Sequence, residues 1–146
     1  MATAVVVDTM IASAWLGLRP SERKARWQPL LERAAWVLPF TVVAEMRFGA
    51  EVARWGQRRR GVLDRLIART GVMPPLDAVT DAYVDLRSWA VRTGHGLGAK
   101  DHEADRWVAA VALAAKLPLA TEDSIFDGVP GLLRADPEDR STTQNR

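Results

Sequence analysis

Four acidic residues stand where an α/β chain can most readily place chemistry. Asp8 closes the apolar run 4–7, and Asp123 comes just after the apolar stretch 117–121. Glu45 and Asp105 lie early in the helix-like stretches 41–54 and 102–115. Carboxylates brought together repel and desolvate one another, which raises their pKa values unless a cation compensates. If the fold gathers these four residues, they predict a divalent-metal site.

Helical periodicity indicates where two of these acids point. At about 100° per residue, positions three, four and seven residues apart share one face of a helix. The apolar or small residues at these spacings are Phe48, Gly49 and Val52 after Glu45, and Val108, Ala109 and Ala112 after Asp105. We therefore expect both carboxylates to lie along the inward faces of their helices.

Three of the four acids also have an ordinary structural explanation. Asp8 suits the N-cap of a helix over 9–17, and Asp123 suits a turn. Asp105 suits the first turn of a helix, where the dipole favours a negative charge. Glu45 does not fit a capping box, because it follows the expected cap Thr41 by four residues rather than three. Four converging acids are harder to explain in this way than any one of them.

The available ligands limit the choice of metal. Cysteine is absent, and the two histidines, His95 and His102, do not have a zinc-ligand spacing. Carboxylate oxygens favour Mg²⁺, with Mn²⁺ as a substitute, and carboxylate-bound magnesium is most often used on phosphates. His102 as a general base is a weaker alternative, because a metal-bound water needs no histidine.

The predicted elements alternate between strands and helices. Strands are expected at 3–7, 36–38, 71–73 and 117–121, and helices at 9–17, 21–34, 41–54, 58–69, 77–92 and 102–115. This alternation is typical of an α/β fold with a mainly parallel sheet and helices on both faces. Ligands of such sheets bind beyond the carboxyl ends of the strands, where the strand order reverses. Asp8 and Asp123 are expected at that edge.

Length and composition predict one globular domain in the cytoplasm. The chain has 146 residues, of which 48% are hydrophobic and 26% charged, and it has neither an apolar run long enough for a membrane span nor a signal-peptide pattern. The net charge is +2, yet the pI is about 9.5 and 17 of the 20 basic residues are arginine. Arginine suits bidentate phosphate contacts, although a GC-rich genome explains the excess equally well.

Other magnesium-dependent folds do not match the motifs. A haloacid-dehalogenase-type phosphatase needs a second aspartate two residues after Asp8, where this chain has Met10. A response-regulator receiver needs an aspartate after its third strand, where this chain has Met73-Pro74-Pro75. The glycine motifs of Walker and Rossmann phosphate-binding loops are absent from the sequence.

The order and spacing of five motifs resemble those of PIN-domain ribonucleases, and among them the VapC-type toxins of bacterial toxin–antitoxin pairs. The motifs are Val5-Val6-Val7-Asp8-Thr9, residues 41–50, residues 102–110, Thr121-Glu122-Asp123 and Val129-Pro130-Gly131-Leu132. The resemblance implies a PIN-like three-layer α/β/α sandwich with a mainly parallel sheet of four or five strands. It also implies a PIN domain over residues 1–136, followed by a polar tail over 137–146 that is expected to be disordered.

The same resemblance implies an activity. Asp8, Glu45, Asp105 and Asp123 are then an acidic quartet that holds Mg²⁺ or Mn²⁺ and a metal-activated water. The expected reaction is endonucleolytic cleavage of RNA that leaves 5′-phosphate and 3′-hydroxyl ends. The expected partners are the RNA, a cognate antitoxin and a second copy of the chain in a homodimer.

Three further residues are candidate helpers of the quartet. Asp101 shares a helical face with Asp105 one turn earlier, although the role of helix cap explains it more simply. Thr9 and Thr121 are expected to orient metal ligands or phosphate through their hydroxyls.

Several arginines are candidates for contacts with RNA. Arg47 and Arg106 lie close in sequence to Glu45 and Asp105, so one of them is expected to steady the scissile phosphate. The densest basic segment comprises Arg54, Arg58, Arg59, Arg60, Arg65 and Arg69, of which Arg58 and Arg59 are the preferred phosphate contacts. A solvated helix face or a contact with an acidic antitoxin explains this segment equally well.

Six tryptophans are many for a chain of this length. Trp36, Trp89 and Trp107 are expected in the core. An apolar groove for a partner helix or for a second copy is expected on the first two helices, from Trp15, Leu16, Leu18 and Trp27.

Two other functions remain open from the sequence alone. The first is a PIN nuclease that matures RNA or cuts structured DNA without a toxin role. The second is a non-catalytic PIN module that binds RNA or protein, which an intact quartet disfavours.

Overall fold

A parallel sheet forms the centre of the computed structural model, which describes residues 3–17 and 19–139. In this part of the chain the sheet has four strands, in the order β3-β2-β1-β4. They are β1 (Ala4–Val7), β2 (Ala35–Pro39), β3 (Gly71–Met73) and β4 (Leu119–Ala120), and every neighbouring pair is parallel. The chain moves outward from β1 to β3 and then returns to the other side of β1, so the strand order reverses between β1 and β4.

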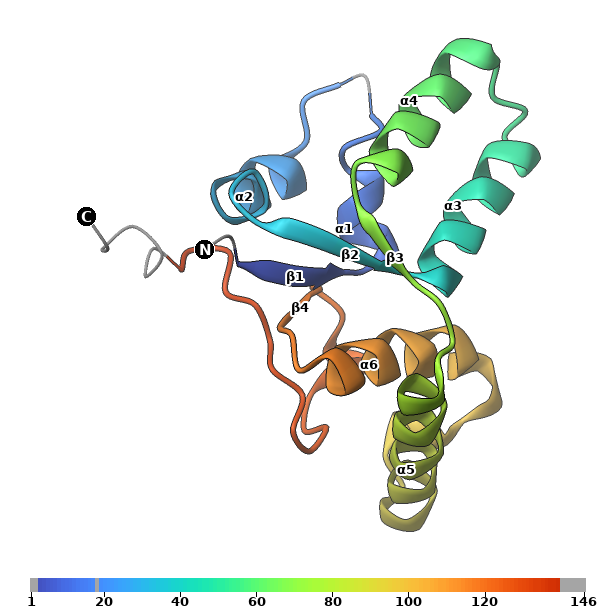
Figure 1. Ribbon diagram of the computed structural model, residues 1–146, viewed down its shortest axis with the longest axis vertical. Helices are drawn as coiled ribbons and strands as arrows, with labels where there is room; N and C mark the ends of the chain where they lie inside the picture. The colour runs from blue at the N-terminus through green and yellow to red at the C-terminus, as the bar shows by residue number, and fades with distance from the viewer. Residues whose placement is uncertain (1–2, 18, 140–146) are drawn as a thin grey trace.

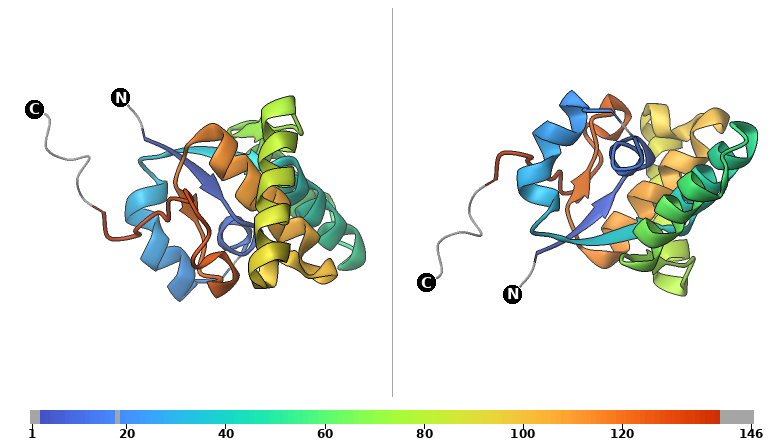
Figure 2. Two further views of the ribbon diagram at one scale, coloured as in Figure 1. Left: turned by 90° about the horizontal axis from the view of Figure 1, so that it is seen from below. Right: turned by 90° about the horizontal axis from the view of Figure 1, so that it is seen from above.

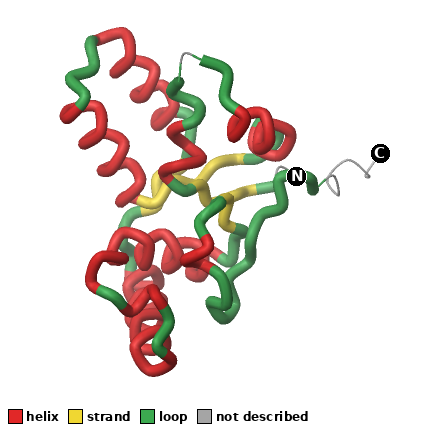
Figure 3. The backbone as a smooth tube through the Cα atoms, turned by 180° about the vertical axis from the view of Figure 1, so that it is seen from behind, coloured by secondary structure: helices red, strands yellow, loops and turns green. Residues whose placement is uncertain are grey.

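Helices cover both faces of this sheet. On one face lie α1 (Thr9–Ser13), α2 (Glu22–Leu31), α3 (Phe40–Val52) and α4 (Gln57–Ala68), and on the other lie α5 (Asp77–Thr93) and α6 (Glu103–Ala115) (Figure 1). Figure 2 looks onto the sheet from its two sides, from below with α5 in front and from above with the other helix layer in front, and in the view from behind the yellow strands lie between groups of red helices (Figure 3). The predicted three-layer α/β/α sandwich is therefore confirmed.

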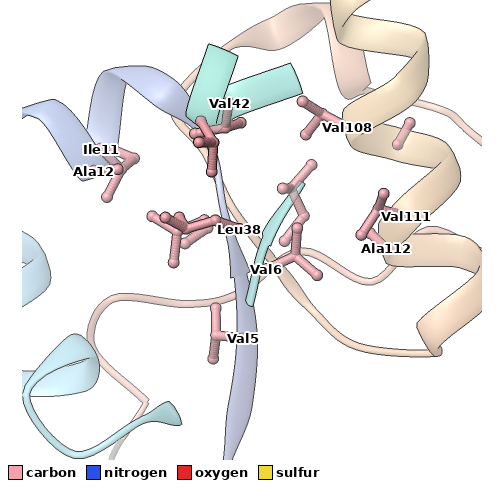
Figure 4. Packing of buried hydrophobic residues seen from close by; sticks show 14 of the residues in the cluster. Val5, Val6, Ile11, Ala12, Leu38, Val42, Val108, Val111 and Ala112 are labelled. Atoms are coloured by element: carbon pink, nitrogen blue, oxygen red, sulfur yellow. The ribbon is translucent and has the colours of Figure 1, made fainter. Parts of the chain in front are cut away.

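The core lies where β1 meets the helices on both faces. Val5, Val6 and Val7 are fully buried, as expected for a central parallel strand whose residues face helices on each side. Figure 4 shows Ile11 and Ala12 of α1 on one side of β1, and Val111 and Ala112 of α6 on the other. This packing fixes the carboxyl end of β1, and with it Asp8.

Most predicted elements are present, but several have other bounds: the strand expected at 117–121 comprises only Leu119–Ala120, and the helix expected at 21–34 ends at Leu31. The first helix ends at Ser13 rather than at Gly17, and turns continue the chain to Leu16. The third helix begins at Phe40 after Pro39, so Thr41 lies inside it and is not its cap. The Thr41 hydroxyl is buried and has no hydrogen-bond partner among the described residues. Ser21, by contrast, caps α2 as predicted by accepting a bond from the Lys24 amide at 3.3 Å.

The chain after β4 returns to the edge of the sheet. The Leu119 amide donates to the Leu133 carbonyl at 2.8 Å, and the Ala135 amide donates to the Leu119 carbonyl at 2.9 Å. Residues 137 and 138 form a turn, in which the Glu138 amide donates to the Asp136 carboxylate at 2.9 Å. The disorder expected for the tail stays a prediction. The rest of the predicted tail, 140–146, lies outside the described residues. Among those described, no helix is both long and apolar enough to span a membrane.

Candidate metal centre

The sheet brings Asp8 and Thr121 together at the point where the strand order reverses. Asp8 directly follows β1, and Thr121 directly follows β4. The Thr121 hydroxyl donates to Asp8 Oδ2 at 2.8 Å, and the Thr9 amide donates to Asp8 Oδ1 at 2.6 Å. Crevices at such reversals are the usual ligand sites of parallel α/β sheets.

Asp8 carries a carboxylate whose ionisation the surroundings oppose. Burial raises the pKa of Asp8, and the negative charges of Asp105 and Glu45 raise it further. The hydrogen bonds from Thr121 and Thr9 lower the pKa but do not cancel the increase. Asp8, Glu45 and Asp105 therefore interact electrostatically in the folded chain, as the sequence predicted for a converging set.

Glu45 reaches this region from α3, but not along the buried face of the helix. Its Oε2 accepts a hydrogen bond from the Thr9 hydroxyl at 2.5 Å. The stripe predicted to be inward is in fact exposed: Phe48 is 69% exposed and Val52 is 67% exposed. The face that α3 buries instead comprises Val42, Val43, Met46 and Ala50. Both faces of α3 are apolar, so periodicity alone selected the wrong one.

Asp105 lies on the inward side of α6, as predicted. The residues that follow it on this face, Val108, Ala109 and Ala112, are buried. Asp105 Oδ2 lies 2.8 Å from Nδ1 of His102. This hydrogen bond raises the pKa of His102; desolvation opposes the increase, and the charges of Asp101, Asp105 and Asp123 add to it.

Asp123 and Asp101 lie at the margin of the cluster. Asp123 caps the short 3₁₀ helix η3 (Ser124–Phe126), accepting from the Ile125 amide at 2.9 Å, while its own amide donates to Thr121 Oγ1 at 3.1 Å. Asp101 is exposed in the 3₁₀ helix η2 (Lys100–His102), and the N-cap of α6 is His102, so Asp101 is not the predicted helix cap. Both acids are close enough to act on the charge of His102.

The cluster consists of hard oxygen donors, but it is not a formed coordination sphere. Across residues 3–17 and 19–139, no three acidic or histidine side chains stand close enough together to hold one ion. The chemistry of the donor set nonetheless fits Mg²⁺ or Mn²⁺, because carboxylate oxygens predominate and a divalent cation offsets the desolvation and the repulsion that raise the pKa of Asp8. Metal binding by the quartet remains a prediction.

Arg106 has a structural role in place of the predicted contact with phosphate. Its side chain is 1% exposed, so it is not available to a ligand at the surface. The guanidinium donates to the carbonyls of Leu97 and Ala99 at 2.8 and 2.6 Å and to the Tyr83 hydroxyl at 3.2 Å. Arg106 thereby ties the segment before η2 to the start of α6.

The other predicted RNA contacts lie outside the cluster. Arg47 is exposed on α3, beside a cavity of about 350 Å³ between α3 and α4. Arg58 and Arg59 begin α4, at the end of the α3–α4 hairpin that lies away from the sheet (Figure 1). The Arg59 guanidinium lies 4.0 Å from the centre of the Trp55 ring, so part of this side chain is used in packing. Contacts of Arg47, Arg58 and Arg59 with RNA remain predictions.

Glu122 is the residue beside the site that the sequence reasoning passed over. It accepts hydrogen bonds from Arg23 and Trp27 at 3.1 and 3.0 Å and from Arg26, all on α2. Burial opposes ionisation of Glu122, but the bonds from Trp27 and Arg23 and the two arginine charges outweigh it and hold its pKa below the usual value. No local sequence pattern pairs α2 with position 122.

The tryptophans divide differently from the prediction. Trp27 and Leu16 are buried, so they line the core and not a groove, and Leu18 lies outside the described residues. Trp36, Trp89 and Trp107 are partly buried against the core, as expected. Trp15 packs edge-on against Trp36 with 5.1 Å between ring centres. These two rings line a cavity of about 490 Å³ with Lys24, Leu31, Glu32, Ala34, Ala35, Arg69 and Thr70.

The fold and the acidic cluster at the strand reversal define the class of this protein. The chain belongs to the PIN domain family, whose pattern it matches over residues 5–132.

The particular relatives are toxins and toxin–antitoxin complexes. Toxin FitB of Neisseria gonorrhoeae is 28% identical over 126 residues, an alignment that covers 82% of this chain and 88% of FitB. The crystal structure of FitAcB from Neisseria gonorrhoeae is similar with a TM-score of 0.70 at 27% identity, covering 91% of this chain and 97% of that one. The structure of VapBC-1 from nontypeable Haemophilus influenzae has a TM-score of 0.77 at 20% identity, covering 94% and 100%. The second structure supports the fold alone.

Proposed function

We propose that this chain is a divalent-metal-dependent endoribonuclease and acts as the toxin of a toxin–antitoxin pair in the cytoplasm. The observation that carries the proposal is the half-buried Asp8 carboxylate at the strand reversal, held by Thr121 and Thr9, whose pKa is raised by desolvation and by the charges of Asp105 and Glu45. A carboxylate whose surroundings oppose its ionisation is stabilised by a bound cation. Membership of the PIN family and the likeness to toxin FitB support the same assignment.

Asp8, Glu45, Asp105 and Asp123 are the residues that would hold Mg²⁺ or Mn²⁺. When bound, the ion supplies Lewis-acid polarisation of a phosphoryl oxygen and a water of lowered pKa. The two threonine hydroxyls restrict the acids: Thr121 holds Asp8, and Thr9 holds Glu45. These bonds keep two carboxylates from turning away while the metal is absent, which limits the rearrangement that binding requires.

His102 is the one basic side chain that contacts the cluster in the described residues. Its bond to Asp105 orients that carboxylate and raises the pKa of the imidazole. An imidazole N–H next to the acids suits a hydrogen bond to a phosphate oxygen of the RNA. An unpaired RNA segment is the expected substrate, because sequence-specific RNA recognition favours unstacked single strands.

The antitoxin is proposed to occupy the cavity lined by Trp15 and Trp36. This cavity is next to the start of β2. It therefore lies at the amino ends of the parallel strands, whereas Asp8 lies at their carboxyl ends. The two indole rings offer an apolar surface, and Lys24 and Arg69 add positive charge to its lining. We therefore expect a segment that carries an aromatic or aliphatic side chain next to an acidic one.

A homodimer is proposed through the outward face of α3. Phe48 and Val52 form an exposed apolar stripe on this helix, next to Glu45 in the helical register. Covering such a stripe with a second copy removes apolar surface from water. Light scattering should give twice the chain mass for the wild type and the single mass for Phe48→Asp. A monomeric wild type at micromolar concentration contradicts the dimer.

The nuclease proposal is tested with purified chain and a structured RNA that contains unpaired loops. We expect cleavage with Mg²⁺ or Mn²⁺, loss of cleavage with excess chelator, and ends that carry 5′-phosphate and 3′-hydroxyl groups. Asp8→Asn should abolish cleavage while the fold is retained, and the matched control Asp81→Asn, an exposed position on α5, should cut normally. Normal cleavage by Asp8→Asn contradicts the site.

The toxin role requires a separate test in cells. Expression of the wild-type chain should arrest growth, Asp8→Asn should not, and co-expression of the cognate antitoxin should restore growth. Cleavage of RNA without growth arrest favours a nuclease of RNA maturation. Cleavage of structured DNA in preference to RNA favours a nuclease that acts on structured DNA. Metal binding without any cleavage favours a non-catalytic module.

A further inference from the structure

We propose that Glu122 is a positioning residue: its carboxylate is clamped by α2, and this clamp holds the loop that carries Thr121 and Asp123 against the carboxyl end of β1. The inference rests on the proposed metal site, because it assigns Glu122 a role in shaping that site. Glu122 itself is assigned no contact with metal or RNA.

Three donors from one helix converge on this single carboxylate. Arg23 Nε donates to Oε2 at 3.1 Å, Trp27 Nε1 donates to Oε1 at 3.0 Å, and Arg26 Nη1 donates to Oε1 as well. The Trp27 side chain is 2% exposed, so the surrounding core fixes the direction of its indole N–H. Bonds between charged groups are the stronger class of hydrogen bond, and two of these three join opposite charges.

The clamped residue lies between the two loop residues that the site uses. On one side, the Thr121 hydroxyl donates to Asp8 Oδ2 at 2.8 Å. On the other side, the Asp123 amide donates to Thr121 Oγ1 at 3.1 Å. Because Thr121 and Asp123 each share a peptide bond with Glu122, fixing the Glu122 side chain restricts both of them. Groups that support metal ligands in this way typically change metal affinity or activity about 10- to 100-fold when they are removed.

A different role for Glu122 makes a different prediction. In this alternative, Glu122 only neutralises Arg23 and Arg26, which otherwise bind phosphate. The side chains of these two arginines are 38% and 51% exposed. Removing the negative charge would then strengthen binding to RNA and leave the metal site unchanged. Positioning predicts the reverse, a weaker metal site with RNA binding unchanged.

The test compares the wild type, Glu122→Gln and the matched control Glu22→Gln, an exposed acid at the start of α2. Glutamine keeps the size of the side chain and an acceptor for Trp27, but loses the attraction to both arginines. Thermal unfolding first establishes that each variant is folded at the assay temperature. Three quantities are then measured: amide hydrogen exchange of residues 121–126 without metal, the Mn²⁺ dissociation constant by calorimetry, and RNA affinity without metal by fluorescence anisotropy.

We expect faster exchange in residues 121–126 of Glu122→Gln and an Mn²⁺ affinity about 10-fold weaker than in the wild type. RNA affinity should be unchanged, and Glu22→Gln should match the wild type in all three measurements. Arg26→Gln should also speed exchange in this loop, and the double variant should add little to either single change, because both remove one interaction.

Unchanged exchange and unchanged Mn²⁺ affinity in Glu122→Gln overturn the positioning role, and tighter RNA binding alone supports the neutralising role in its place. A wild-type chain that binds no Mn²⁺ overturns the metal site, which is the failure of the proposed function. In that case the exchange comparison still decides whether Glu122 holds the loop.

Discussion

Replacement of Arg106 by methionine should destabilise the fold rather than weaken RNA binding. The guanidinium is 1% exposed and donates to two backbone carbonyls, at 2.8 Å to Leu97 and at 2.6 Å to Ala99. Methionine fills a similar volume but donates no hydrogen bond. A buried polar group left without its partner costs about 1–3 kcal/mol, and Leu97 is itself fully buried.

The expected magnitude is the balance of two opposing effects. Loss of the two carbonyl bonds and of the bond to the Tyr83 hydroxyl destabilises the folded chain. Removal of a buried cation, whose guanidinium bonds carbonyl and hydroxyl oxygens in the described part of the chain, recovers part of this cost, because its desolvation penalty disappears. We expect Arg106→Met to lower the free energy of unfolding by about 2–4 kcal/mol. The stability of Arg106→Lys should fall between those of the wild type and Arg106→Met, because one ammonium cannot reproduce the guanidinium's fork of donors.

Urea unfolding followed by circular dichroism measures this change. The matched control is Arg92→Met, an exposed arginine on α5, which should stay within about 0.5 kcal/mol of the wild type. The reasoning is refuted if Arg106→Met is as stable as Arg92→Met and instead loses affinity for RNA. That result would restore the phosphate contact that the sequence predicted for Arg106.

Three further predictions concern stability and binding. Asp8→Asn should stabilise the metal-free fold at neutral pH. Because the native pKa of Asp8 is raised, wild-type stability should decline as pH rises from about 3.9 through the native pKa. Chemical unfolding across this pH range should show a flatter stability profile for the variant than for the wild type. Trp27→Phe should lower the free energy of unfolding by about 1.5–3 kcal/mol through the lost bond to Glu122. Because the native pKa of Glu122 is lowered, the stability that this carboxylate contributes should be present above about pH 4.3 and should disappear as pH falls through the native pKa. Equal losses of stability at low and neutral pH would contradict this prediction. Lys24→Glu should weaken antitoxin binding in calorimetry without changing RNA cleavage, and an unchanged dissociation constant would remove the proposed cavity from the interface.

The fold was predictable because its signals are local. The run 4–7 is apolar and β-branched, and the structure buries it as the central strand β1. The stripe after Asp105 on α6 was also assigned correctly, because the opposite face of that helix begins with the polar Glu103. On α3 the same method failed. Val42 and Met46 compete with Phe48 and Val52 for the core, and only the tertiary packing decides between them.

The site was predictable in its members but not in its contacts. Asp8 and Thr121 follow strands, so their meeting could be expected from the parallel topology. The role of Arg106 could not, because nothing in a sequence distinguishes an arginine that satisfies buried carbonyls from one that meets a phosphate. The same holds for Glu122, which is paired with a helix 99 residues away from it, at Arg23.

The measurement that tests the central claim most directly is Mn²⁺ binding by calorimetry to the wild type and to the variants Asp8→Asn, Glu45→Gln, Asp105→Asn and Asp123→Asn. If the four carboxylates form one metal site, the wild type should bind Mn²⁺, each variant should bind it at least about 10-fold more weakly, and Asp81→Asn should match the wild type. Absence of binding by the wild type, or an affinity that none of the four substitutions changes, would contradict the account.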